Sequence, residues 1–395
     1  LSCPVGLFHP LHHAGLSRRT PDRPPSGRGL TRHVRRRPGE HARIECLRNT
    51  SNVCVTLRMT GKMRLNGQWL TWLLVAVAPV VWAQAPANQT VARDIPGIVK
   101  AGTPIVVIKN GLAGADDPIG LPDGSVLFTE PNASRVLKLG KDGTLSTFLE
   151  NTYGGLGLSL DSTGRLIQAR SEDGHTGAAV IDPPARRAIL AETYNGLPFN
   201  RPNDLIADKK GGVYVTDPGL NGDQRAALER TNGANALASQ LPPAVYYIPP
   251  GGNPIRIAEG IERPNGVTLS RDERILYINN TNGIYLLAFD IQPDGTVRNR
   301  RNLAVYQGRS KTSNGIPGIV TGADGLTIDS EGRLYGLTEM GVEVFSPGGK
   351  PLGVIPVSCN GGRCQGIAFG GPNKRTLYLA GAGGILKIQL LAKGF

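Results

Sequence analysis

The segments LPDGSVLFTE (121–130) and ADKKGGVYVTD (207–217) share one pattern: the end of a strand, a polar turn that usually contains glycine, and a second apolar strand. Four more copies occur in the 395-residue chain: LDSTGRLIQAR (160–170), SRDERILYINN (270–280), DSEGRLYGLT (329–338) and GPNKRTLYLA (371–380). The second strands are predicted to begin at Val126, Leu166, Val213, Ile275, Leu334 and Thr376, which gives spacings of 40, 47, 62, 59 and 42 residues. Six such units predict an all-β fold, a six-bladed β-propeller of four-stranded blades.

Two other segments complete the predicted propeller, which spans residues 103–395 after a linker at residues 84–102. The apolar run TPIVVIKN (103–110) is expected to add a strand to the last blade, which closes the ring and removes its exposed edge. The third unit is long because it contains GDQRAALERTNGANALASQ (222–240). Its Ala, Leu, Arg and Gln content predicts a helical or flexible insertion.

The positive charge of the chain is concentrated at its beginning. The formal net charge is +13, which by itself suggests a nucleic-acid or anionic-membrane partner. Residues 1–62 hold 12 Lys and Arg against 3 Asp and Glu, a net +9, so only +4 remains for residues 63–395. This stretch has no apolar period, and no aromatic residues alternate with its arginines to stack bases. We therefore expect residues 1–62 to be a disordered, non-native upstream extension, and we expect no nucleic-acid partner.

The stretch MRLNGQWLTWLLVAVAPVVWAQA (63–85) has the layout of a secretory signal peptide: a cation, an apolar run from Leu70 to Trp82, and then small residues. Residues 63–83 are the predicted signal peptide, and the true start is left open between Met59 and Met63. The run is too short to span a bilayer comfortably, and no other segment is apolar enough. The expected product is exported, periplasmic or secreted, without a membrane span after cleavage.

Only two cysteines follow this segment, Cys359 and Cys364 in SCNGGRC. In an oxidising compartment they are expected to form a disulfide that closes a glycine-rich turn. A metal site built on these cysteines lacks partners, because His175 is the only histidine in the same part of the chain.

The repeat also predicts a site. Eight positions before the turn residue of each unit stand Asp116, Leu156, Asn203, Asn265 and Asp324, and nine before the sixth turn, to allow for one extra residue, stands Gln365. Equivalent positions of successive blades are related by rotation about the central channel, so these side chains are expected to point at one axis. Taken singly, an Asp or Asn before a strand is mostly a turn former. Together, two carboxylates and two amides form an all-oxygen set that suits one divalent cation, Ca²⁺ first, with Mg²⁺, Mn²⁺ and Zn²⁺ as alternatives. The predicted metal ligands are Asp116, Asn203, Asn265 and Asp324.

These residues carry a resemblance to a known family. RPND (201–204), RPNG (263–266), ADG (323–325) and CQGIAFGGPNKRTLYLA (364–380) resemble the senescence-marker-protein/gluconolactonase/regucalcin family of six-bladed propellers. The resemblance covers about residues 105–390. It implies one divalent cation at the channel mouth, often Ca²⁺, and hydrolysis of sugar lactones or related cyclic esters. By motif, Asn203, Asn265 and Asp324 match residues at or near the family's metal.

The same resemblance assigns substrate contacts to Arg201 and Asn203. An ion pair between Arg201 and Asp204 is the structural alternative for that arginine. In the first blade the chain has Asp116-Asp117-Pro118 where the family usually has Glu-Gly-Pro, so the shorter Asp116 is expected to reach an ion directly or through water. Asp217 and His175 are both interpreted as turn residues without a catalytic role.

Two classes of function follow from this sequence. The first is a gluconolactonase-like, metal-dependent carboxylic ester hydrolase that opens a small-molecule lactone or related ester, with Asp324 as the catalytic base or water-orienting residue. The alternative is a non-catalytic propeller that binds a ligand or protein and has a structural metal. The substrate, the metal and the oligomeric state are left open.

Overall fold

The computed structural model describes residues 60–65, 68–73, 91–172, 174–220, 222–233, 237, 240–308, 310–313 and 316–395. The chain divides into two units, residues 1–82 and 83–395, and each is described by itself. In the first unit, β1 (Thr60–Leu65) and β2 (Gln68–Leu73) pair as antiparallel strands. Most of the predicted extension (1–62) and signal peptide (63–83) lies outside the described residues, so both stay predictions.

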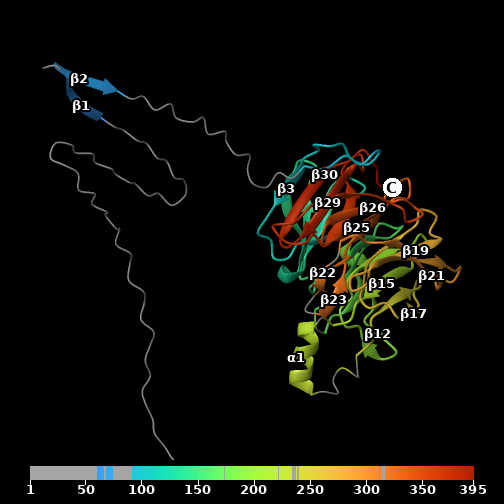
Figure 1. Ribbon diagram of the computed structural model, residues 1–395. Coiled ribbons are helices and arrows are strands. Elements are labelled where there is room, and N and C mark those ends of the chain that lie inside the picture. The colour runs from blue at the N-terminus through green and yellow to red at the C-terminus, as the bar shows by residue number, and fades with distance from the viewer. Residues whose placement is uncertain are drawn as a thin grey trace, which may run out of the picture. The chain divides into compact units, whose positions relative to one another are not determined.

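The second unit contains six four-stranded antiparallel sheets, the blades of a six-bladed β-propeller (Figure 1). This confirms the fold predicted from the repeat. The strands of the first three blades, in chain order, are β4 (Asp116–Gly120), β5 (Val126–Glu130), β6 (Arg135–Leu139) and β7 (Leu145–Glu150); β8 (Leu158–Leu160), β9 (Leu166–Arg170), β10 (Gly177–Asp182) and β11 (Ala188–Ala191); β14 (Leu205–Ala207), β15 (Val213–Asp217), β16 (Ala244–Ile248) and β17 (Ile255–Ala258).

Blades four to six follow the same order. Their strands are β18 (Pro264–Leu269), β19 (Ile275–Asn280), β20 (Tyr285–Ile291) and β21 (Val297–Val305); β24 (Leu326–Ile328), β25 (Leu334–Thr338), β26 (Gly341–Phe345) and β27 (Pro351–Ile355); β28 (Gly366–Gly370), β29 (Thr376–Gly381), β30 (Gly384–Gln389) and β3 (Ile105–Lys109). The second strand of every blade begins at the residue that the sequence predicts. The first strands β4, β8, β14, β18, β24 and β28 contact one another in a closed ring around the axis.

The ring is closed by a strand from the start of the domain. β3 pairs with β30 in an antiparallel register with Ile105 opposite Ile388, so the last blade contains three strands from the C-terminal end and one from residues 105–109 (Figure 1). This confirms the closure that the apolar run at 103–110 predicts, and it leaves the last blade with its full four strands.

Central strands are buried because neighbouring blades cover both of their faces. Every residue of β5, β15 and β25 is buried, whereas the outermost strand β21 is largely exposed. The turn between the first two strands needs a left-handed residue, which is glycine in four blades. Glu273 (φ 55°) and Lys374 (φ 50°) adopt the same conformation in the other two. Local turn chemistry and alternating burial therefore explain why the repeat is readable in the sequence.

The segment predicted as a linker (84–102) needs a correction in its described part. Ala92, Ile95, Ile98 and Val99 are at most 2% exposed and pack into the core between the fifth and sixth blades. Val91 also forms a bridge with Pro104. Residues 91–102 are thus part of the folded domain, because their apolar side chains fill the gap beside the closing strand.

The remaining elements lie between or within blades. The predicted insertion forms α1 (Gly222–Asn232), which has no buried residues and projects from the strands (Figure 1). Two short hairpins link blades: β12 (Thr193–Tyr194) with β13 (Leu197–Pro198), and β22 (Ser310–Ser313) with β23 (Ile316–Val320). The 3₁₀ turns are η1 (Pro131–Ala133) and η2 (Pro184–Arg186). Across the described residues, no helix has the length and apolar character needed to cross a membrane.

Candidate active site

The starts of the six first strands line one small pocket. All six positions predicted from the repeat contribute to it, and the lining residues are Asp116, Asp117, Leu156, Gly157, Asn203, Asp204, Asn265, Asp324, Gly325 and Gln365. The pocket has a volume of about 10 Å³. That is close to the smallest space that holds one water molecule, so a single small ion or water fits and a sugar ring does not.

Backbone hydrogen bonds between blades hold these strand starts together. The amide of Gly157 donates to the carbonyl of Asn203 (2.7 Å), and the amide of Gly325 donates to the carbonyl of Gln365 (2.7 Å). The amide of Gly266 donates to the carbonyl of Asp324 (3.2 Å) in the same way. A Cβ atom at any of these glycines would clash with the neighbouring strand. The glycines therefore allow the first strands to approach closely enough to form so small a pocket.

In the first and third blades an aspartate replaces this glycine and makes the link between blades with its side chain. The carboxylate of Asp117 accepts from the amide of Leu158 (2.5 Å), and that of Asp204 accepts from the amide of Val267 (2.8 Å). Leu158 and Val267 hold the same repeat position in the second and fourth blades. Asp117 and Asp204 thus have a structural role that the sequence analysis missed. The sequence feature that could have indicated this role is an aspartate at a repeat position where the other four blades have glycine.

The pocket carboxylates are electrostatically unfavourable in their charged form. Burial, reinforced by the charge of Asp324, raises the pKa of Asp116 to about 7. Burial likewise raises the pKa of Asp204 to about 7 and that of Asp117 well above its usual range. Burial also raises the pKa of Asp324, although the nearby Arg363, Arg263 and Arg201 oppose the effect. A positive charge placed in the pocket would offset this penalty.

Asn265 is held in one orientation by its neighbours. Its Nδ2 donates to Oγ1 of Thr281 (3.0 Å), and that hydroxyl donates onward to the carbonyl of Ala323 (2.7 Å). Because the amide nitrogen is used in these contacts, the oxygen Oδ1 is available as a ligand atom. Asn265 is only 4% exposed, so its orientation is protected from solvent.

A cation in this pocket would need the asparagines. Within the described part of the chain, no three or more His, Cys, Asp or Glu side chains are grouped as a metal site. Asp116 and Asp324 supply two carboxylates to the pocket, and Asn203 and Asn265 supply two amide oxygens. The donor set is therefore the all-oxygen type that hard cations prefer.

Arg201 lies near the pocket without lining it. Its charge acts on both Asp116 and Asp324. Among the described residues it forms no ion pair with Asp204, the structural alternative, because both oxygens of Asp204 accept backbone amides. Its own amide donates to Asp217 (3.1 Å), which also accepts from the amides of Asn200 and Gly219. Asp217 thus forms the turn that its position suggested.

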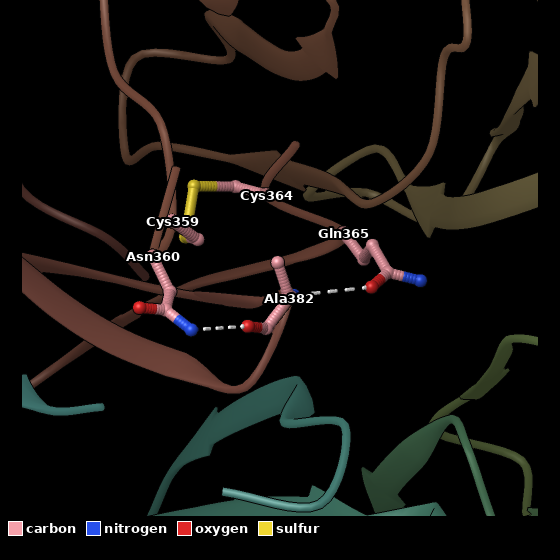
Figure 2. The surroundings of a disulfide bond; sticks show 5 residues. All are labelled: Cys359, Asn360, Cys364, Gln365 and Ala382. Atoms are coloured by element: carbon pink, nitrogen blue, oxygen red, sulfur yellow. Dashed lines mark hydrogen bonds between the residues drawn. A yellow bond between two sulfur atoms is a disulfide. The ribbon is translucent and has the colours of Figure 1, made fainter. Parts of the chain in front are cut away.

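Arg363 was not predicted as a site residue, but it contacts the pocket residue Asp324 directly. Its Nη2 donates to Oδ2 of Asp324 (3.0 Å), and its Nη1 donates to the carbonyl of Gly322 (2.8 Å). Arg363 immediately precedes Cys364, which the structure joins to Cys359 by a disulfide (Figure 2). The loop is also tied to its neighbours, because Asn360 donates to the carbonyl of Ala382 and Gln365 accepts from the Ala382 amide (Figure 2). The disulfide loop therefore holds the guanidinium of Arg363 against the carboxylate of Asp324.

Residues 120–383 match the profile of the SMP-30/gluconolactonase/LRE-like region, which covers nearly the whole propeller. The chain belongs to the SMP-30/gluconolactonase/LRE-like family. The pocket at the channel mouth is thus the candidate active site of a family member.

Curated family relatives resemble the chain over most of its length. The gluconolactonase of Zymomonas mobilis is 27% identical over 311 residues, which cover 74% of this chain and 83% of the relative. A pentonolactonase of Haloferax volcanii is 24% identical over 248 residues, or 62% of this chain and 65% of the relative.

Solved structures show the same fold. A gluconolactonase of Xanthomonas campestris superimposes with a TM-score of 0.59 at 24% identity, covering 78% of this chain and 99% of that chain. A calcium-binding protein, regucalcin, of Agrobacterium tumefaciens superimposes with a TM-score of 0.56 at 19% identity, covering 73% and 94%.

His175 takes no part in the pocket of this family member. It is exposed, and its ring stacks on Tyr153 with the centroids 4.1 Å apart. That placement agrees with its interpretation as a turn residue.

Proposed function

We propose that the chain is a lactonase, a carboxylic ester hydrolase, and that it uses one divalent cation held by Asp116, Asn203, Asn265 and Asp324. The observation that supports the proposal is that these four residues, from four blades, all line one pocket with a volume of about 10 Å³. Family relatives named as gluconolactonase and pentonolactonase support lactone hydrolysis. The family neighbour described as a calcium-binding regucalcin supports the cation.

The residues fit a hard cation on three grounds: charge, donor chemistry and size. The charge of Asp324 helps to raise the pKa of Asp116, carboxylate and amide oxygens are the ligands that Ca²⁺ prefers, and the cavity has the size of one ion or water. We therefore propose Ca²⁺ first, with Mg²⁺, Mn²⁺ and Zn²⁺ as alternatives. A bound cation would polarise the lactone carbonyl and stabilise the developing oxyanion.

We propose that Asp324 orients the attacking water and accepts its proton. Burial raises the pKa of Asp324, which makes it a better proton acceptor than an exposed carboxylate. The water oxygen bonds to the carbonyl carbon, its proton passes to Asp324 and then to the ring oxygen, and the ring C–O bond breaks to give a hydroxy acid. Arg363 donates to Oδ2 of Asp324 and thereby fixes the carboxylate. We propose that Arg201 and Asn203 contact the substrate.

We further propose that the protein works outside the cytoplasm, in the periplasm or as a secreted protein. The apolar stretch after Met63 supports export, and the Cys359–Cys364 disulfide supports an oxidising compartment. Periplasmic fractionation of cells that express the full chain, combined with the mass of the purified product, tests both points.

The test of the activity is acid release from aldonolactones by chelator-treated protein, before and after Ca²⁺ is restored. We expect opening of glucono-1,5-lactone that is lost with chelator, restored by Ca²⁺ and reduced at least 100-fold in Asn265→Ala. Asn253→Ala, at an exposed position of the third blade, is the matched control and should retain full activity. A protein that binds Ca²⁺ but opens no lactone or ester would instead be a non-catalytic propeller with a structural metal.

A further inference from the structure

A second set of equivalent positions lies two residues before the pocket residues. Arginine occupies it in blades three, four and six, and glycine occupies it in blades one, two and five; in blade order the set is Gly114, Gly154, Arg201, Arg263, Gly322 and Arg363. We call these six residues the mouth positions. Three arginines at repeat-equivalent places bring positive charge to the same end of the channel as the pocket.

The mouth positions matter because the pocket is too small for a substrate. A cavity of about 10 Å³ holds one ion or water, whereas a lactone ring has at least five ring atoms and its substituents. The ring and its substituents must therefore lie outside the cavity, next to the mouth positions. The side chains there decide which substituents are accepted.

One of the three arginines is fully used within the protein. Arg363 forms an ion pair with Asp324, bonds the carbonyl of Gly322, and lies 3.6 Å from Glu339. A Cβ atom at Gly322 would clash with this guanidinium, so the glycine at the fifth mouth position makes room for it. Arg363 is thus committed to positioning a pocket carboxylate.

The other two arginines are not committed in this way. Arg263 is only 3% exposed, its Nε is buried without a hydrogen-bond partner, and it has no ion pair among the described residues. Arg201 likewise forms no ion pair with any described residue. Arg201 and Arg263 hold equivalent positions in the neighbouring third and fourth blades, and the charge of Arg201 acts on Arg263. A buried, unpaired cation beside a second cation is costly unless an anion binds there.

Nearby carboxylates do not balance this pair. Asp217, which acts on the charge of Arg263, is used by three backbone amides. The charge of Arg201 also acts on Asp116 and Asp324, but under the proposed function both carboxylates face the cation, and Asp324 already bonds Arg363. Guanidinium groups bind carboxylate and phosphate through paired donors, so the missing partner has the chemistry of an oxyanion.

We propose that Arg201 and Arg263 bind an anionic group carried by the lactone, so that the preferred substrates are lactones of sugar acids with a second acid group. The proposal rests on the proposed function, because it places the lactone carbonyl at the pocket and the acid group at the arginines. The second group is an oxyanion, either a carboxylate or a phosphate. A neutral aldonolactone would leave both arginines without a partner.

The test compares substrates that differ only in this group. D-Glucaro-1,4-lactone carries a carboxylate where D-glucono-1,4-lactone has a hydroxymethyl group, and 6-phosphoglucono-1,5-lactone carries a phosphate where glucono-1,5-lactone has a hydroxyl. We expect kcat/KM to be at least tenfold higher for the anionic member of at least one pair, and the better pair identifies the acid. Equal or lower values for both anionic members overturn the proposal and leave the lactonase function intact.

Variants assign the preference to the two arginines. Arg263→Gln and Arg201→Gln should reduce the anionic-to-neutral ratio of kcat/KM at least fivefold. Arg274→Gln, an exposed arginine at the opposite end of the fourth blade, should keep both the ratio and the activity. An equal loss for both members of a pair in folded Arg263→Gln and Arg201→Gln contradicts the assignment.

Calorimetry separates this proposal from the proposed function, because it requires no turnover. We expect D-glucarate or 6-phosphogluconate to bind at least tenfold tighter than the neutral polyol D-glucitol, with the difference lost in Arg263→Gln. If no lactone is opened but this pattern is seen, the anion site stands and the lactonase function fails. If D-glucitol binds as tightly as both acids, the anion site fails.

Discussion

Buried aspartates lie at both ends of the first strands, and they differ in how many hydrogen-bond partners they have. At the turn end, Asp329 is fully buried and accepts from the amides of Glu331 and Arg333, from Nε of Arg333 and from the hydroxyl of Tyr335. At the pocket end, Asp116 is also buried, but within the described part of the chain its carboxylate accepts one hydrogen bond, from the amide of Asp117. The same residue type on the same kind of strand is stabilised at one end and left short of partners at the other.

The pKa shifts express the same contrast. At the turn end, burial opposes ionisation of Asp161, but hydrogen bonds from Arg165 and Thr163 outweigh it and lower the pKa. At the pocket end, burial and the charge of Asp324 raise the pKa of Asp116 to about 7. Aspartates at the turn end therefore stabilise the fold. Asp116 at the pocket end instead favours a ligand that brings positive charge.

The largest expected effect is at the pocket end. Asp324→Asn removes both the proposed proton acceptor and a proposed ligand charge, so kcat/KM for lactone opening should fall about 1,000-fold. Steady-state acid release measures this, and a circular-dichroism spectrum unchanged from the parent protein shows that the fold is intact. A fall of less than tenfold in a folded variant would show that the pocket aspartates are not functionally distinct.

The converse substitution is at the turn end. Asp329→Asn breaks the buried ion pair with Arg333 and should lower the free energy of unfolding by about 3 kcal/mol. Because Asp329 is at the other end of its blade, kcat/KM below the melting temperature should stay within twofold of the parent value. Urea denaturation and acid release measure the two effects. A large loss of activity at unchanged stability would show that Asp329 acts on catalysis rather than on the fold.

Cation removal should give the pocket a pH signature. Asp116 and Asp204 have a folded-state pKa of about 7 against an ordinary value of 3.8, so between these pH values the folded state binds more protons than the unfolded state. The free energy of unfolding of chelated protein should therefore fall as the pH rises from about 4 to 7. Ca²⁺ at about 100 times its Kd should restore about 2.7 kcal/mol at pH 7.

Thermal unfolding over this pH range, with chelator and with Ca²⁺, measures the effect. Asp116→Asn is the matched variant, because it should reduce the pH slope of the chelated protein. Stability that is flat from pH 4 to 7 and insensitive to Ca²⁺ would remove the electrostatic distinction between the two ends.

The smallest expected effect concerns the disulfide beside Arg363. The bridge between Cys359 and Cys364 closes a short loop, so the Cys359→Ser/Cys364→Ser double variant should lose about 2 kcal/mol of unfolding free energy. Arg363 keeps its bonds to Asp324 and Gly322, so kcat/KM should fall less than tenfold. Denaturant titration and acid release check this, and a loss comparable to that of Asp324→Asn would place the loop within the catalytic machinery.

The turn end shows why so much of the fold could be predicted. The six second strands begin where the sequence predicts, because a left-handed turn residue and a run of buried apolar residues are local signals. The six pocket positions are found by counting eight or nine residues back from each turn residue, because equivalent positions of the blades are related by rotation about the channel. Fold class, ring closure and the pocket lining were therefore within reach of the sequence.

Other features depended on tertiary contacts. Residues 91–102 had the composition of a linker, and only the gap between the fifth and sixth blades explains why Ile95 and Ile98 are buried. The segment SCNGGRC, which contains Arg363, predicts only a disulfide, and the contact of Arg363 with Asp324 depends on the space left by Gly322. Asp117 and Asp204 looked like neighbours of site residues, and their links to the next blade are visible only when two blades are placed together.

We propose that the pocket end binds one cation through side chains from four blades. A crystal structure of the protein grown with Ca²⁺ is the decisive test. We expect one ion, with oxygens of Asn203, Asn265 and Asp324 about 2.3–2.6 Å away and Asp116 bound directly or through one water. A pocket that holds only water at saturating Ca²⁺, or an ion that contacts fewer than two of these four side chains, would contradict it.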